Sequence, residues 1–267
     1  MRRRLRQWLE LWDEQDEAAG QAEAHPALES HPNALSPDGR ATSVLVPLCG
    51  RGPDLARLAE NGMQAVGVEC SRRAIAGFAS DHGYELSMGD GGGEDVSFTT
   101  WYAGPCTIFE GDWFEATPEL LGGKFEAAFD HGALAVVEPK RRAVYATVLS
   151  AMLRPTARLI VIAPEFDESS CAPELTALGP HSLPLQELRE LFPEFDAEVL
   201  FEAEVGAPPG GPPGADHPSP SGRKALGRLA AAANLGWVLE RAVLLRREAP
   251  LYTPRPGQVP LWTPRGV

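Results

Sequence analysis

The sequence predicts an α/β protein with a mostly parallel central sheet and helices on both of its faces. Three observations predict this class. Strand-like and helix-like segments alternate through the middle of the chain. Residues 159–163 are apolar at every position, which is typical of a parallel strand buried on both faces. A strand, a glycine turn, a helix and a second strand follow one another within residues 44–69, in the order found in doubly wound sheets.

This first αβ unit also indicates a ligand. A strand at residues 44–46 leads into a turn that contains Gly50, and a helix is expected at about residues 54–61. The next strand, at residues 65–68, ends in Glu69. Glycine lets the backbone approach a ligand without a Cβ in the way, and an acid at that strand end accepts hydrogen bonds from ribose hydroxyls. The unit therefore predicts nucleotide or nucleoside binding.

The glycine turn favours a ligand without phosphate. It offers Gly50 and Gly52 but lacks the full G-x-G-x-x-G pattern, and Pro53 has no N–H to donate. A pyrophosphate needs several free N–H groups at such a turn, whereas the nucleoside of S-adenosylmethionine (SAM) needs mainly close backbone approach and the acid. We therefore expect SAM rather than a dinucleotide. The alternative is an ordinary αβ unit whose strand happens to end in an acid.

The other elements are expected from periodicity, turn residues and helix caps. Ser71 is the expected N-cap of a helix that runs to about residue 82. The remaining predictions, in chain order, are a helix at 5–17, a polar linker to about 42, a glycine-rich loop at 89–95, two strands within 96–110, a strand at 124–130, a helix at 138–153, a strand at 159–163, a helix at 184–192, and strands near 197–203 and 238–245.

The last two strands flank residues 206–222, which are rich in Gly and Pro and cannot form a core element. This composition predicts a long flexible connection between two antiparallel strands, so we expect an antiparallel edge to the sheet. We expect one domain at 43–248 that contains this insertion, an N-terminal segment at 1–42 and a proline-rich tail at 249–267.

Composition excludes several classes of function. The 267 residues are 43% hydrophobic, which suffices for a full core, and the net charge of −13 argues against a nucleic-acid partner. No apolar run reaches the ~18 residues of a membrane span. Acidic residues follow the basic start at once, unlike in a transit peptide, so we expect a cytoplasmic protein. The four cysteines have no metal-site or disulfide spacing, and we expect mostly buried thiols and no metal.

The motifs resemble the thiopurine S-methyltransferase family of SAM-dependent methyltransferases. The most specific of them are V-L-V-P-L-C-G at 44–50 and V-G-V-E at 66–69. Weaker matches are a W-x-x-x-W pair at 8–12, a G-D-F-F-like strand end at 111–114, a D-R-A-L-like element at 130–134 and a G-P-P-F-x-V-P-like segment at 179–184. The resemblance implies a Rossmann-like class I fold. It also implies methyl transfer from SAM to a soft nucleophile, such as a thiol, a thiopurine, or a selenium or tellurium species.

The resemblance also assigns residues to the SAM site. Their implied roles are to line the cleft (Leu48, Gly50), hold the ribose (Glu69), flank the adenine (Asp112, Trp113) and form an N-terminal lid over the sulfonium (Trp8, Trp12). Each tryptophan has a structural alternative. Trp8 and Trp12 could form one apolar helix face, and Trp113 could belong to the core. Cys49 is expected to be a small packing residue beside the cofactor.

Two departures from the family concern the acceptor side. His131 stands where the family has Arg, close to the methionine of SAM and to the substrate. It is our candidate catalytic residue, as a hydrogen-bond donor or a weak base towards a thiol; the alternative is a tolerated replacement. Residues 17–21 lack the aromatic side chain of the family's G-F-H-Q element.

The acceptor therefore stays open among small molecules, and we expect a monomer. Besides the S-methyltransferase, the alternatives are a halide or thiocyanate methyltransferase and a SAM-binding protein of little activity. The incomplete glycine motif disfavours a dinucleotide-dependent oxidoreductase.

Overall fold

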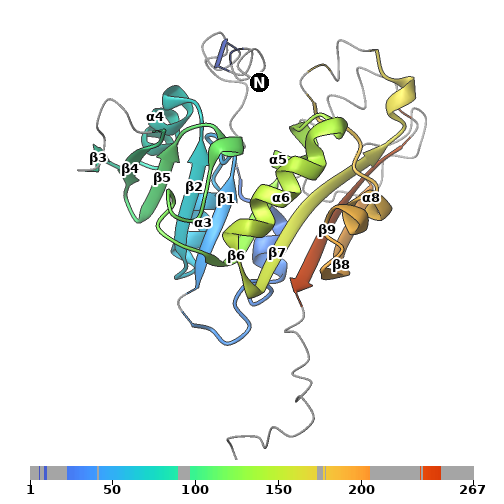
Figure 1. Ribbon diagram of the computed structural model, residues 1–267, viewed down its shortest axis with the longest axis horizontal. Helices are drawn as coiled ribbons and strands as arrows, with labels where there is room; N and C mark the ends of the chain where they lie inside the picture. Colours follow the sequence, from blue (N-terminus) through green and yellow to red (C-terminus); the bar gives the residue numbers. More distant parts are fainter. Residues whose placement is uncertain are drawn as a thin grey trace, which may run out of the picture.

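A mixed sheet forms the centre of the computed structural model, which describes residues 6, 9–10, 23–40, 42–89, 97–172, 177, 179–204, 235 and 237–247. Within these residues the sheet has nine strands in the order β3-β4-β5-β2-β1-β6-β7-β9-β8 (Figure 1). The strands are β1 (Ser43–Pro47), β2 (Gln64–Glu69), β3 (Leu86–Met88), β4 (Thr99–Ala103), β5 (Cys106–Glu110), β6 (Phe125–His131), β7 (Leu153–Phe166), β8 (Phe195–Glu204) and β9 (Val238–Arg247).

The middle of the sheet is parallel, as the sequence predicts. Strands β5, β2, β1, β6 and β7 each pair in parallel with their neighbours in this series. Strand β9 is antiparallel to both β7 and β8, so the antiparallel strand lies one position in from the edge that β8 forms. At the other edge β4 is antiparallel to β5 and to β3. The Rossmann-like α/β class is confirmed, because the mixed, mostly parallel sheet carries helices on both faces.

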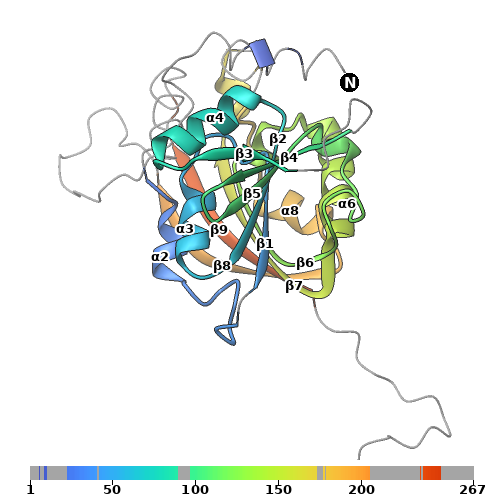
Figure 2. The ribbon, with the colours of Figure 1, turned by 90° about the vertical axis from the view of Figure 1, so that its left-hand side faces the viewer.

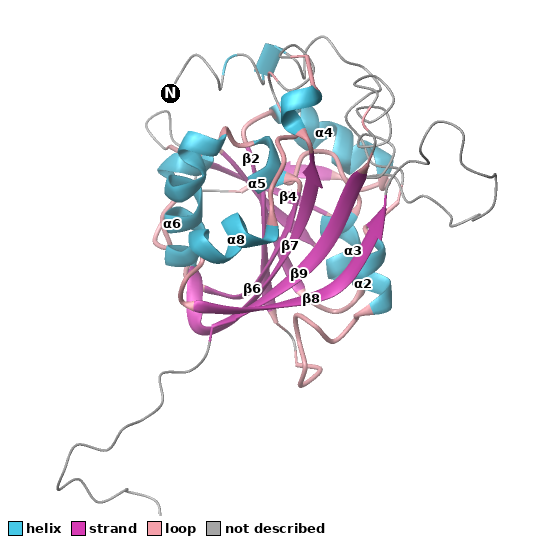
Figure 3. Ribbon diagram, turned by 90° about the vertical axis from the view of Figure 1, so that its right-hand side faces the viewer, coloured by secondary structure: helices cyan, strands magenta, loops and turns pink. Residues whose placement is uncertain are grey.

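Helices cover the sheet from both sides. Figures 2 and 3 show α6 and α8 on one face, and α2 and α3 on the other. The helices and short 3₁₀ turns are α2 (Pro26–Ser30), α3 (Asp54–Glu60), α4 (Arg72–Asp81), η1 (Trp113–Glu115), α5 (Ala133–Val136), η2 (Pro139–Arg141), α6 (Arg142–Met152), η3 (Glu168–Ser170) and α8 (Leu185–Leu191). No helix among the described residues is long and apolar enough to cross a membrane.

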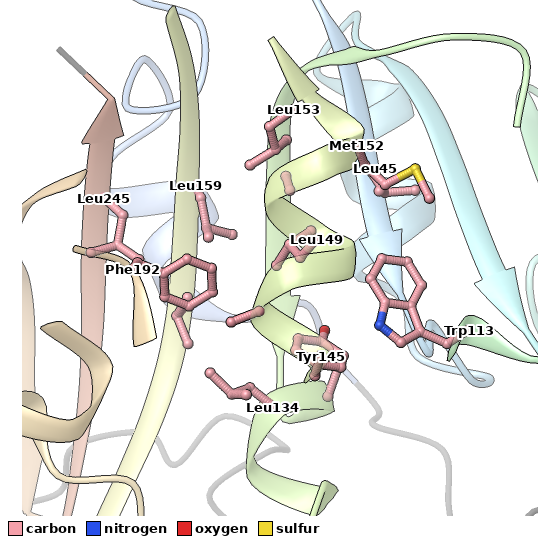
Figure 4. Close-up of a cluster of buried hydrophobic side chains, with 14 of the residues drawn as sticks. Leu45, Trp113, Leu134, Tyr145, Leu149, Met152, Leu153, Leu159, Phe192 and Leu245 are labelled. Atoms are coloured by element: carbon pink, nitrogen blue, oxygen red, sulfur yellow. The ribbon is translucent and has the colours of Figure 1, made fainter. Parts of the chain in front are cut away.

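Each face of the sheet has its own hydrophobic core. On the α6 side, large side chains from the sheet and helices meet around Leu149 and Phe192 (Figure 4). On the other side, Ile75 and Phe78 of α4 and Leu55 and Leu58 of α3 pack on the strands. The apolar run at 159–163 contributes to both clusters, since alternate side chains of a strand point to opposite faces.

Local sequence signals explain several boundaries. The Ser71 hydroxyl accepts a hydrogen bond from the N–H of Ala74 and caps α4, as expected. Gly104 has φ +55° in the tight connection between β4 and β5, a conformation that costs glycine little. The segment after Glu138 begins as a 3₁₀ turn, so α6 starts later than the sequence predicts.

The prediction of a polar linker up to about residue 42 is partly wrong. Residues 26–30 form α2, and Ala27, Leu28 and Leu35 are buried in the core beside α3. Five residues are too few for a clear helical period, which hid this element. The described residues include only three positions of the expected N-terminal helix. They include none of loop 90–96, insertion 206–222 or tail 249–267.

Candidate active site

The candidate site lies where the strand order of the sheet reverses. From β1 the chain passes through α3 to β2 on one side, whereas β6 lies on the other side of β1. The three strands are parallel, so their carboxyl ends share one edge of the sheet, where α/β proteins bind their ligands. The turn with Gly50 follows β1, Glu69 ends β2 and His131 ends β6. The fold therefore brings together three of the residues assigned from the sequence.

The glycine turn is tightly held against β2. Leu48 has φ +47° and Gly50 has φ +57°, so both adopt the left-handed conformation, which is uncommon for leucine. The N–H of Cys49 donates to the Val68 carbonyl at 3.0 Å. A Cβ on Gly67 would lie 2.6 Å from the Cys49 Sγ. The turn and β2 thus require a glycine at position 67 for their close contact.

The Glu69 carboxylate joins this turn to the start of α4. Its Oε2 accepts from the N–H of Gly50 at 3.0 Å, while its Oε1 accepts from the N–H of Cys70 at 2.8 Å and of Ser71 at 2.9 Å. Glu69 is only 4% exposed. Burial raises its pKa, and these hydrogen bonds oppose that rise. The acid is therefore fixed in direction at the carboxyl end of β2.

Asp112 lies close to Glu69 along the same edge of the sheet. The N–H of Gly111 donates to the Glu69 carbonyl at 2.9 Å, which places the next residue beside the end of β2. The Asp112 Oδ1 accepts from the N–H of Phe114 at 3.0 Å and so caps η1. The side chain stays partly exposed, as a ligand-binding residue requires.

Trp113 belongs to the core and not to a ligand surface. The residue is 1% exposed, and its indole packs on the ring of Tyr145 with 5.3 Å between centroids (Figure 4). An indole buried in this way has no face left for an adenine, so its assignment as an adenine-flanking residue is corrected to the structural alternative. Trp8 and Trp12 lie outside the described residues.

His131 is hydrogen-bonded to a carboxylate that the sequence reasoning missed. Its Nδ1 lies 2.7 Å from Oδ2 of Asp54, the first residue of α3 after the glycine turn. Both side chains are less than one-tenth exposed. Burial by itself would lower the pKa of His131, but the charge and hydrogen bond of Asp54 outweigh it and raise the pKa. Burial would raise the pKa of Asp54, but His131 and the backbone of His25 lower it.

The neighbour of His131 on β6 has a structural role. Asp130 is fully buried and faces the α6 side, where it accepts from the Leu134 N–H at 3.0 Å and the Tyr145 hydroxyl at 2.7 Å. Burial raises its pKa to about 6. Alternation along the strand therefore turns Asp130 towards α5 and α6, and His131 towards α3.

Comparison with known proteins identifies the family. The sequence profile described as thiopurine S-methyltransferase matches residues 3–205. The chain belongs to the thiopurine S-methyltransferase family. The chain is accordingly a SAM-dependent methyltransferase.

Curated members of this family are similar over most of their length. A thiopurine S-methyltransferase of Pseudomonas putida strain F1 is 33% identical over 200 residues, which are 74% of this chain and 87% of the relative. One from Gluconobacter oxydans strain 621H is 30% identical over 198 residues, 74% of this chain and 84% of the relative.

Solved structures share the fold. A SAM-dependent methyltransferase from Anabaena variabilis aligns with a TM-score of 0.52 at 13% identity, over 91% of this chain and 95% of its own. Magnesium protoporphyrin IX methyltransferase from Synechocystis, solved with S-adenosylhomocysteine, aligns with a TM-score of 0.50 at 12% identity, over 83% and 82% of the two chains.

Proposed function

We propose that this thiopurine S-methyltransferase family member transfers the methyl group of SAM to a small soft nucleophile. The acceptor class would be a thiol, a thiopurine-like ring, or a selenium or tellurium species. The observation that carries the proposal is the Glu69 carboxylate, held between the glycine turn and α4 in a chain 33% identical to curated thiopurine S-methyltransferases. When bound, SAM supplies a methyl group already activated by its sulfonium charge.

The described residues fit a SAM nucleoside without requiring a phosphate site. Leu48 and Gly50, whose backbones are both left-handed, would line the cleft. Glu69 would accept hydrogen bonds from the ribose hydroxyls, and Asp112 from the adenine amino group. Trp8 and Trp12, in a proposed lid of residues 5–25, would cover the sulfonium.

The chemistry asks little more of the protein than alignment and exclusion of water. A thiol has a pKa near ~8.5 and must lose its proton before or during attack. His131 is the proposed residue for this proton, because it ends β6 beside the glycine turn. We also propose that the chain acts as a cytoplasmic monomer on small molecules and not on nucleic acid.

A small anion is the second candidate acceptor. His131 is shorter than the arginine of the family, and residues 17–21 carry no aromatic side chain for a purine ring. Both departures favour an acceptor smaller than a thiopurine, such as iodide or thiocyanate.

Two measurements test the proposal. Calorimetry of the full chain with S-adenosylhomocysteine should show saturable binding; no binding would contradict the SAM site. Product analysis with SAM and an aromatic thiol, a selenol, iodide or thiocyanate in parallel should give S- or Se-methylated products. Methyl iodide or methyl thiocyanate as the main product would favour the second candidate. Binding without any methylated product would leave a SAM-binding protein of little activity.

A further inference from the structure

Four titratable side chains from distant parts of the chain meet in the interior behind the glycine turn. They are His25 before α2, Asp54 at the start of α3, His131 at the end of β6 and Glu240 on β9. The rings of His25 and His131 meet edge to face with 4.8 Å between centroids. Hydrogen bonds link these side chains. Among the described residues, no group of three or more His, Cys, Asp and Glu is arranged to hold a metal ion.

The hydrogen bonds of His25 identify it as a neutral imidazole. Its Nδ1 accepts from the N–H of Ala27 at 3.1 Å, which leaves the proton on Nε2. That Nε2 lies 3.4 Å from Oε1 of Glu240. Burial lowers the pKa of His25, in agreement with the neutral form. Both ring nitrogens thus have structural tasks, and His25 is not the proton acceptor.

The other histidine is held in the opposite tautomer. The Nδ1–H of His131 donates to Oδ2 of Asp54 at 2.7 Å, so the basic lone pair of the neutral ring is on Nε2. The other oxygen of Asp54 accepts from the backbone N–H of His25 at 2.7 Å. With both oxygens engaged, the carboxylate cannot rotate away, and it fixes the orientation of the His131 ring.

Charge around His131 favours its protonated form. Asp54 on α3 and Glu240 on β9 act on it by their charge, and Asp130 acts from the opposite face of β6. The adjoining ring of His25 is neutral. These carboxylates raise the pKa of His131 despite its burial. A general base is most effective when its pKa lies near the operating pH, and the carboxylates move the pKa of His131 upwards from its ordinary value, in the direction of neutral pH.

We propose that His131 is the general base for the acceptor thiol and that Asp54 is its positioning residue. The inference rests on the proposed S-methyl transfer. The S–H bond of the acceptor breaks as its proton passes to Nε2 of His131. The sulfur electron pair forms the new S–CH₃ bond while the methyl–sulfonium bond breaks, which leaves neutral S-adenosylhomocysteine. The imidazolium, paired with Asp54, then releases its proton to solvent.

Acceptors of different acidity test this proposal. A nitro-substituted aromatic thiol is already a thiolate at neutral pH, whereas an alkyl thiol is protonated and needs the base. We expect His131→Gln to lower kcat/KM for the alkyl thiol by about 100-fold, and Asp54→Asn by at least about 10-fold. Both variants should lose much less rate with the preformed thiolate than with the alkyl thiol, because the thiolate needs no base. The matched control Asp196→Asn removes an exposed carboxylate of β8 that pairs with Arg246 and should leave both rates unchanged.

A nuclear magnetic resonance titration adds a readout that does not depend on turnover. The His131 ring should titrate above the usual range in the unmodified chain, and its pKa should fall in Asp54→Asn. In the unmodified chain, the alkyl-thiol rate should rise with pH along the His131 titration and not along that of the acceptor, a test that needs no variant.

The outcomes separate this inference from the proposed function. Failure to bind S-adenosylhomocysteine or to methylate any thiol overturns the proposed function. If binding and methylation persist but the variants slow both thiols equally, or the pH profile follows the acceptor's pKa, His131 is not the base.

Discussion

Glu69 shows how one buried carboxylate can organise a binding site. It accepts hydrogen bonds from three backbone N–H groups, of Gly50, Cys70 and Ser71. These groups belong to the turn after β1 and to the segment that starts α4. The residue proposed to hold the ribose therefore also sets the shape of the turn, and the two roles cannot be separated by mutation.

Replacement of Glu69 by Gln should weaken S-adenosylhomocysteine binding by about 10- to 100-fold, because hydrogen bonds to a charged group contribute ~1.5–3 kcal/mol. The amide NH₂ would also face a backbone donor. Calorimetry measures the effect. The control is Glu110→Gln, since Glu110 is aligned with Glu69 on β5 but accepts from the Trp101 indole N–H. Equal affinity in Glu69→Gln and the unmodified chain would contradict the assignment.

Asp130 should make folding stability depend on pH. Its pKa is raised to about 6 by burial, so the folded chain holds this proton at pH values where the unfolded chain has lost it. The stabilisation is present at low pH and is lost as the pH rises through about 6. Relative to Asp130→Asn, the free energy of unfolding of the unmodified chain should fall by about 2–3 kcal/mol between about pH 4 and 7.5. Urea denaturation of both proteins across this range measures it, and parallel curves would refute it.

At the scale of single residues, the sequence predicts the ends of strands better than side-chain partners. Gly50 and Glu69 were found because both lie within one continuous αβ unit. Asp54 also follows the glycine turn directly, a signal that was available and overlooked. The contact of His25 with Glu240 joins residues 215 positions apart, and no local pattern encodes such a pair.

At the scale of elements, the glycine turn and β2 are in close contact. A methyl group on Gly67 would meet the Cys49 Sγ at 2.6 Å and the Leu55 Cδ2 at 3.1 Å. The turn, β2 and α3 therefore converge on a single position without a side chain, and their relative placement depends on it.

Gly67→Ala should lower the free energy of unfolding by about 1–3 kcal/mol, the usual cost of overpacking, and weaken S-adenosylhomocysteine binding by displacing the turn. The double variant Cys49→Ala/Gly67→Ala removes the sulfur and should recover part of both losses. Chemical denaturation and calorimetry measure the two effects. If the double variant recovers neither stability nor binding, the strain does not come from this sulfur contact.

Element prediction succeeds where a segment is long or capped. The β4–β5 hairpin, α4 and the antiparallel β8–β9 pair were expected and are present. Helix α2 is too short to show a helical period in the sequence. Helix α6 begins later than predicted because a 3₁₀ turn that starts at Pro139 precedes it. Strand β7 runs from Leu153 to Phe166 and is longer than the apolar run that predicts it. Its first residues are largely exposed, so they show no apolar pattern in the sequence.

At the scale of the whole molecule, the two strands on either side of the Pro/Gly-rich segment end next to each other. Glu204, the last residue of β8, is aligned with Leu239 near the start of β9. The ends that the connection must join are therefore held together by the sheet itself. The proposed domain at 43–248 does not need the length of residues 206–222 to close.

Replacement of residues 206–222 by Gly-Ser-Gly-Ser should change the free energy of unfolding by less than about 0.5 kcal/mol, since loop-closure cost grows only with the logarithm of length. Thermal and urea denaturation measure the change. A loss of several kcal/mol would show that the segment is part of the folded domain.

The cysteines near Glu69 bear on the proposed methyl transfer to sulfur. Cys49 lies in the glycine turn with its Sγ packed against Gly67, and Cys70 directly follows the proposed ribose acid, so two soft sulfur atoms lie near the proposed donor site. Burial, reinforced by the negative charge of Glu69, raises the pKa of both thiols well above the ordinary value. Both therefore stay protonated and poorly nucleophilic at neutral pH. If SAM binds as proposed, the surroundings that shape the turn also protect these sulfur atoms against methylation by the donor.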